Sequence, residues 1–127
     1  MTALPNRPTV SIEEYLQLDQ DSTGIRYEYS DGHVTMLAGG TLDHSKIGFN
    51  VARALHDVLR ASGCQVFTSD ARVRLSKTRY VYPDVSVSCD ERDDGKIESI
   101  HLVVEVLSPN TESYDRGKKF LFLYYQQ

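Results

Sequence analysis

The 127-residue sequence has only two cysteines, and no apolar run approaches the ~20 residues that a membrane-spanning helix needs. The first ten residues, MTALPNRPTV, lack the basic start and the apolar stretch of a secretory signal peptide. These absences favour a cytoplasmic protein with no membrane partner. Because Cys64 and Cys89 show no CxxC spacing and have no second pair nearby, we expect neither a zinc site nor a disulfide, and both should be buried, reduced thiols.

Basic charge is also scarce, since 14 Lys and Arg face 18 Asp and Glu, for a net charge of −4. This balance disfavours a protein that coats nucleic acid through a broad basic surface, although a local basic groove stays possible. The densest basic run, ARVRLSKTR over residues 71–79, is most simply a solvated face. The chain contains no GxGxxG, P-loop, GxSxG or HExxH motif, so dinucleotide, triphosphate, serine-hydrolase and zinc-protease functions lack support.

The N-terminal half of the sequence predicts two helices and a hairpin. Ser11 and Glu14 form a capping box that begins a short helix over residues 11–18. An Asp-Gly pair at residues 31–32 predicts the turn of a β-hairpin. A four-turn apolar stripe then predicts a long helix, with Asp43 as its N-cap and Gly63 at its end.

The C-terminal half predicts mainly strands. Four segments have the alternating or apolar pattern of strands, namely 64–69, 71–75, 80–89 and 101–108. A last helix is expected from about Ser113 to the end of the sequence. With 40% hydrophobic and 25% charged residues, this order of elements predicts one soluble α/β domain over residues 1–127.

The apolar segment HLVVEVLS carries Glu105 in its middle. Burial of an unpaired carboxylate costs several kcal/mol, so Glu105 needs a partner. Strand alternation places Asp84 on the polar face of the neighbouring strand. If the polar faces of the two strands coincide, Asp84 and Glu105 converge and can bind a hard divalent cation such as Mg²⁺. Alternatively, Glu105 pairs with an Arg of the 71–79 run and Asp84 caps a bulge, and spacing alone does not decide between these.

Three further groups of residues are candidates for the same site. Lys118 and Lys119 lie on the predicted last helix, where Lys119 either forms a surface ion pair with Asp115 or delivers an ammonium group to a scissile phosphate. Glu28 alternates with two tyrosines, and most such glutamates face water. His44 lies on the core-facing stripe of the long helix, where a satisfied buried histidine is the more common arrangement.

Two segments, PDVSV over residues 83–87 and VVEVLSPNTESYDRGKKF over residues 103–120, resemble the PD-(D/E)XK nuclease superfamily. The closest likeness is to its Uma-two branch of restriction endonuclease-like proteins. The resemblance implies a mixed central β-sheet flanked by helices and a Mg²⁺- or Mn²⁺-dependent endonuclease that cleaves DNA.

The same resemblance assigns roles to individual residues. It implies that Asp84 and Glu105 bind the metal and that Glu28 and His44 line the site. Leu107 stands where the superfamily usually has its lysine, and Lys119 is the implied substitute, with Lys118 as second choice.

The sequence departs from this branch at its C-terminus. Members usually continue through another strand and a final helix, whereas this chain ends at Gln127, so we expect a truncated domain. Its apolar last helix then predicts a homodimer or other self-association. Two alternatives to a nuclease stay open: a catalytically inactive remnant that acts as an interaction module, and an α/β domain that binds a small anionic ligand.

Overall fold

The computed structural model describes residues 9–89, 100–107 and 120–125. Along this part of the chain the elements follow in the order α1 (Ile12–Asp21), β1 (Tyr27–Ser30), β2 (His33–Met36), α2 (Leu42–Leu59), a 3₁₀ turn η1 (Arg60–Ser62), β3 (Gln65–Phe67), β4 (Val73–Ser76), β5 (Arg79–Val81), β6 (Val85–Ser88), β7 (Leu102–Leu107) and β8 (Phe120–Tyr125).

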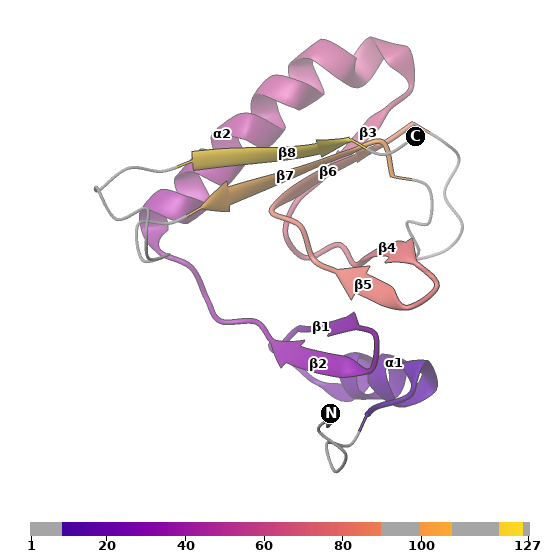
Figure 1. The fold of residues 1–127 in the computed structure, drawn as a ribbon. Helices are drawn as coiled ribbons and strands as arrows, with labels where there is room; N and C mark the ends of the chain where they lie inside the picture. The colour runs from indigo at the N-terminus through magenta and orange to yellow at the C-terminus, as the bar shows by residue number, and fades with distance from the viewer. Residues whose placement is uncertain (1–8, 90–99, 108–119, 126–127) are drawn as a thin grey trace, which may run out of the picture.

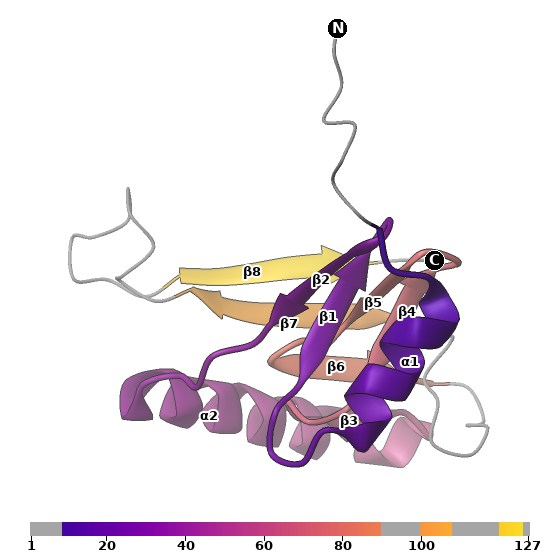
Figure 2. The same ribbon diagram turned by 90° about the horizontal axis from the view of Figure 1, so that it is seen from below.

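The strands form two antiparallel sheets. Sheet A has the order β2-β1-β5-β4, and sheet B has the order β3-β6-β7-β8. Helix α2 lies across sheet B, while α1 lies beside β1 of sheet A at the other end of the molecule (Figures 1 and 2). The predicted restriction endonuclease-like α/β fold is confirmed, although the described strand pairs are all antiparallel where a mixed sheet was expected.

Both faces of sheet B are covered, and alternation along its strands decides which residues face which layer. One cluster packs strands of sheet B against α2 through Ala52, Val85 and Val104, with Val51, Leu55, Val66 and Leu102 around them. The other cluster packs sheet B against β4 and β5 through Val73, Ile100 and Val103, with Phe67, Ala71, Leu75 and Val81 around them. The second face is the one that continues to the candidate site.

The two helices and the hairpin predicted in the N-terminal half are present, although α1 runs to Asp21 rather than to residue 18. The capping box of α1 is complete, with Ser11 and Glu14 each accepting from the other's backbone N–H. Asp31 and Gly32 both adopt positive φ angles, 48° and 92°, which is the geometry of a tight hairpin turn. For α2 the predicted cap is wrong, because Thr41, not Asp43, accepts from the backbone N–H of His44 at 3.1 Å.

Residues 80–89 form parts of two strands in different sheets. β5 belongs to sheet A and β6 to sheet B, so Tyr82, Pro83 and Asp84 are the passage between the sheets. A proline is tolerated there because the passage lies outside both strand ladders, so no backbone N–H of this residue is needed for pairing. This position explains why two residues that resist β-structure interrupt the run of valines and tyrosines.

The predicted last helix is wrong over residues 120–125. This segment is β8, which pairs with β7 from Leu102↔Tyr125 to Leu107↔Phe120. Its six consecutive aromatic and leucine residues suit a strand better than an amphipathic helix, which needs a polar stripe. Residues 113–119 lie outside the described part of the chain. The predicted self-association stays a prediction, although residues 120–125 would contribute to it as a strand and not as a helix.

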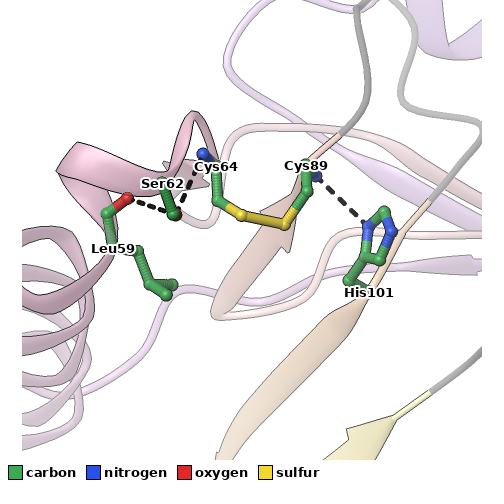
Figure 3. The surroundings of a disulfide bond; sticks show 5 residues. All are labelled: Leu59, Ser62, Cys64, Cys89 and His101. Atoms are coloured by element: carbon green, nitrogen blue, oxygen red, sulfur yellow. Dashed lines mark hydrogen bonds between the residues drawn. A yellow bond between two sulfur atoms is a disulfide. The ribbon is translucent and has the colours of Figure 1, made fainter.

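The prediction of two buried, reduced thiols is also wrong. Cys64 and Cys89 form a disulfide (Figure 3), with Cys64 half-buried and Cys89 exposed. Gln65 pairs with Ser88 in the β3–β6 ladder, so the register sets the preceding and following cysteines opposite each other. His101 Nδ1 accepts from the Cys89 backbone N–H at 3.2 Å beside the bond. Spacing along the sequence could not reveal a pairing that depends on strand register.

Reduction of this disulfide should lower the free energy of unfolding by about 2–4 kcal/mol, because the bond closes a loop between residues 25 positions apart. Urea denaturation with and without a thiol reductant measures the change. A double variant, Cys64→Ser with Cys89→Ser, should match the reduced wild type and ignore the reductant. Equal midpoints for oxidised and reduced wild type would contradict the prediction.

None of the helices in the described part of the chain has the length and hydrophobicity needed to cross a membrane.

Candidate metal and catalytic site

The register between β6 and β7 brings two carboxylates to one place. Val85 pairs with Val104 and Ser86 with Val103, so the next position of the same antiparallel register sets Asp84 opposite Glu105. Because opposite residues of an antiparallel pair share a face, their side chains lie on the same face. This register agrees with a coincidence of the two polar faces.

Two contacts hold the carboxylate of Asp84. Its Oδ2 accepts from the backbone N–H of Val106 at 2.7 Å, a bond that crosses to β7 just beyond the end of the ladder. His44 Nε2 lies 3.3 Å from the same oxygen. Asp84 therefore makes a cross-strand contact rather than capping a bulge.

His44 reaches Asp84 because of the way α2 begins. The Thr41 cap places His44 in the first turn, and the ring packs against the preceding loop. A Cβ at Gly40 would lie only 3.1 Å from His44 Nδ1, so a glycine at this position lets the loop approach the ring closely. The side chain of His44 is 24% exposed, and it faces the site instead of the core.

Glu28 reaches the same site from the other sheet. It lies on β1, and its Oε2 accepts from the backbone N–H of Tyr82 at 2.8 Å. Tyr82 begins the passage to β6, so the hydrogen bond ties Glu28 to the segment that carries Asp84. Glu28 is half-buried and does not simply face water.

The surroundings of Glu105 disfavour its charged form. Burial raises its pKa to about 8, and the negative charge of Asp84, a hydrogen bond with Asp84 and the charge of Glu28 act in the same direction. The alternative in which Glu105 pairs with an Arg of the basic run finds no support, because no arginine is among the described groups that shift its pKa, and Arg72 forms its ion pair with Asp19 at 2.9 Å. The neighbours that perturb Glu105 are carboxylates.

A cavity of about 1060 Å³ joins these residues. Its wall includes Glu28, His44, Asp84 and Glu105, together with Arg26 and Tyr82. The structure thus brings together four of the five residues predicted for the site. The fifth, Lys119, and its second choice Lys118 lie outside the described residues.

The chemistry of this donor set suits a hard divalent cation. Within the described ranges, no group of three or more His, Cys, Asp or Glu side chains is placed to hold a metal ion, so the site offers no complete set of protein ligands. Mg²⁺ does not need one, since it keeps several waters and is commonly bound through one or two carboxylates. A carboxylate such as Glu105, whose ionisation is opposed by burial and by neighbouring carboxylates, would gain from a cation beside it.

Sequence reasoning missed three residues that surround the site, namely Arg26, Tyr82 and Asp19. The Arg26 guanidinium lies over the Tyr82 ring, 5.4 Å from its centre, and donates to the backbone carbonyl of Ser69. The Tyr82 hydroxyl donates to Asp19. Because all three contacts join segments far apart in the sequence, no local pattern could reveal them.

A family model and two relatives match this chain. Residues 12–124 match the model of the Uma2 family, described as "Putative restriction endonuclease". The chain is 41% identical over 117 residues to the uncharacterized protein slr1290 of Synechocystis sp. (strain ATCC 27184 / PCC 6803 / Kazusa), covering 89% of this chain and 61% of that protein. It is 28% identical over 128 residues to the uncharacterized protein sll1609 of the same organism, covering 96% of this chain and 72% of that one.

No solved structure matches the chain significantly. The match to the family model spans both sheets and includes Glu28, His44, Asp84, Glu105 and Lys119. This chain therefore belongs to the Uma2 family of restriction endonuclease-like proteins.

Proposed function

We propose that this chain is an endonuclease that depends on Mg²⁺ or Mn²⁺ and hydrolyses phosphodiester bonds in DNA. The observation that carries the proposal is the placement of Asp84, the residue just before β6, opposite Glu105 of β7, within a cavity that also includes Glu28 and His44. Membership of a family described as restriction endonucleases supports a nuclease.

Each described residue of the cavity has a separate role in such a site. Asp84 and Glu105 would hold the cation through their carboxylate oxygens, and the contact with His44 would keep Asp84 oriented. A cation bound there would supply positive charge to a phosphodiester oxygen and lower the pKa of a water molecule. Glu28 would orient a water molecule from the opposite wall. Lys119 immediately precedes β8 in the sequence, and we propose it, before Lys118, as the group that stabilises the developing negative charge.

The carboxylates of the cavity favour binding of a phosphate group only when a divalent cation is also bound. Among the Asp, Glu, Lys, Arg and His residues of the lining that the structure describes, three are carboxylates, at positions 28, 84 and 105, and the other two are Arg26 and His44. A phosphate group would be repelled by this wall unless a divalent cation intervened. We therefore expect DNA to bind only with the metal and to bind more weakly as salt rises.

A cleavage assay tests the function. Wild type is incubated with single- and double-stranded DNA in Mg²⁺ or Mn²⁺, beside Asp84→Ala and a control, Asp57→Asn, which removes an exposed carboxylate of α2 outside the cavity lining. The cleavage rate of Asp84→Ala should be at least about 100-fold lower than that of wild type, since the variant lacks a carboxylate proposed to hold the catalytic cation. Asp57→Asn should cleave like wild type.

The controls separate the proposal from its rivals. Equal cleavage by wild type and Asp84→Ala would show that the activity comes from another site or a contaminant. A wild type that binds Mn²⁺ but cuts no DNA would favour the inactive interaction module. Binding of small phosphates without any divalent cation would favour the anion-binding domain.

A further inference from the structure

A single buried carboxylate joins the segments that build the candidate site. Asp19 of α1 has a side chain only 3% exposed. Its Oδ1 accepts from the backbone N–H of Tyr27 at 2.9 Å, at the start of the strand that carries Glu28. Its Oδ2 accepts from Arg72 at 2.9 Å and from the hydroxyl of Tyr82. One side chain thus contacts three separate segments.

Tyr82 is held at both of its ends. The hydroxyl donates to Asp19, and the backbone N–H donates to Glu28 at 2.8 Å. The Arg26 guanidinium packs over the face of the Tyr82 ring and so restrains the ring as well. Burial, followed by the hydrogen bond with Asp19, raises the pKa of Tyr82 to about 12, so its hydroxyl keeps the proton that it donates.

The position of Tyr82 determines the position of Asp84, because the backbone between them is restricted. Pro83 is fully buried, its ring fixes its own φ near −65°, and it restricts the preceding residue to extended conformations. Few soft torsions therefore separate the Tyr82 ring from the Asp84 carboxylate. A shift of Tyr82 would turn Asp84 away from the Val106 amide and from Glu105.

We propose that Asp19 and Tyr82 are positioning residues of the site, which hold Asp84 against Glu105 and Glu28 beside them without touching substrate or cation. The inference rests on the proposed cation site for its functional meaning. Asp19 acts only through Tyr82 and Tyr27, because no described contact joins it to a carboxylate of the cavity.

The test compares two tyrosines that lose the same group. Tyr82→Phe removes the hydroxyl bonded to Asp19 and keeps the ring and the backbone. Tyr29→Phe is the matched control, because Tyr29 is 5% exposed and its hydroxyl donates to the Val10 carbonyl at 2.6 Å, away from the cavity. Asp19→Asn is a second test variant, which keeps the shape but loses the charge that Tyr82 and Arg72 share.

The first readout needs no cation. Hydrogen–deuterium exchange of the Val106 amide, which donates to Asp84, reports whether Asp84 stays in place. In chelator, exchange at Val106 should be about tenfold faster in Tyr82→Phe than in wild type, the size expected for loss of one hydrogen bond. Tyr29→Phe should leave that amide unchanged even where it lowers the melting temperature.

The second readout is the affinity for Mn²⁺ by calorimetry. Tyr82→Phe should bind about tenfold more weakly, as expected for loss of an outer-sphere partner, and Tyr29→Phe should bind like wild type. The inference is overturned if Val106 exchange or Mn²⁺ affinity in Tyr82→Phe equals that of wild type, or if Tyr29→Phe changes them equally. A wild type that binds no cation would defeat the proposed function, and the exchange result alone would then decide the positioning role.

Discussion

Asp84→Asn and Glu105→Gln should each weaken Mg²⁺ or Mn²⁺ binding by more than about 100-fold, since even an outer-sphere partner of a metal ligand is worth about 10- to 100-fold. Each substitution keeps the shape of the side chain and removes the negative oxygen that a hard cation requires. Calorimetric titration of the metal-free protein measures the loss, with Asp57→Asn as the control that removes an exposed carboxylate.

Neither variant should unfold. The two carboxylates face each other, and Asp84 contributes to the raised pKa of Glu105, so replacement of either one removes the repulsion that arises when Glu105 ionises. An asparagine at position 84 can still accept from the Val106 amide. We therefore expect metal-free melting temperatures equal to or above that of wild type. Equal metal affinity in wild type and both variants would exclude this site, and a variant that unfolds would show that the carboxylates support the fold instead.

Much of the site could be predicted because its signals are local. A glutamate inside an otherwise apolar strand is anomalous, and strand alternation by itself assigns Asp84 and Glu105 to the polar faces of their strands. The capping box and the Asp-Gly turn are likewise encoded within a few residues. Each of these features can be recognised from the residues of its own strand, helix start or turn.

Apart from the N-cap of α2, the errors share one physical cause, which is pairing between distant segments. The disulfide depends on the β3–β6 register, and β8 depends on β7 as a partner along its whole length. A run of six apolar residues is compatible with either a buried helix or a strand when its neighbour is unknown. Asp19 could not be predicted because its three partners come from residues 27, 72 and 82.

The stability of the metal-free protein should fall as the pH rises toward 8 and beyond. The folded-state pKa of Glu105 is raised to about 8 by burial and by the neighbouring carboxylates, against an ordinary value of 4.5. Between these values the folded protein binds more protons than the unfolded chain, so each rise in pH favours unfolding. The contribution of Glu105 to the free energy of unfolding is fully present below about pH 4.5 and is lost as the pH passes through about 8.

The expected loss is roughly 2–4 kcal/mol, less than the full shift would give, because water reaches part of the side chain and screens its neighbours. Urea denaturation in chelator between pH 5.5 and 9.5 measures it for wild type, Glu105→Gln and Asp57→Asn. The difference between wild type and Glu105→Gln isolates position 105, since all other titrating groups are common to both.

Glu105→Gln should gain relative to wild type as the pH rises, and Asp57→Asn should follow wild type throughout. Addition of Mg²⁺ at pH 9 should restore the stability of wild type, because a ligand that binds only the folded state stabilises it by mass action. It should do little for Glu105→Gln, which lacks one of the two proposed ligands. Parallel curves for wild type and Glu105→Gln would mean that Glu105 ionises without cost. The carboxylates would then be too well solvated to require a cation between them.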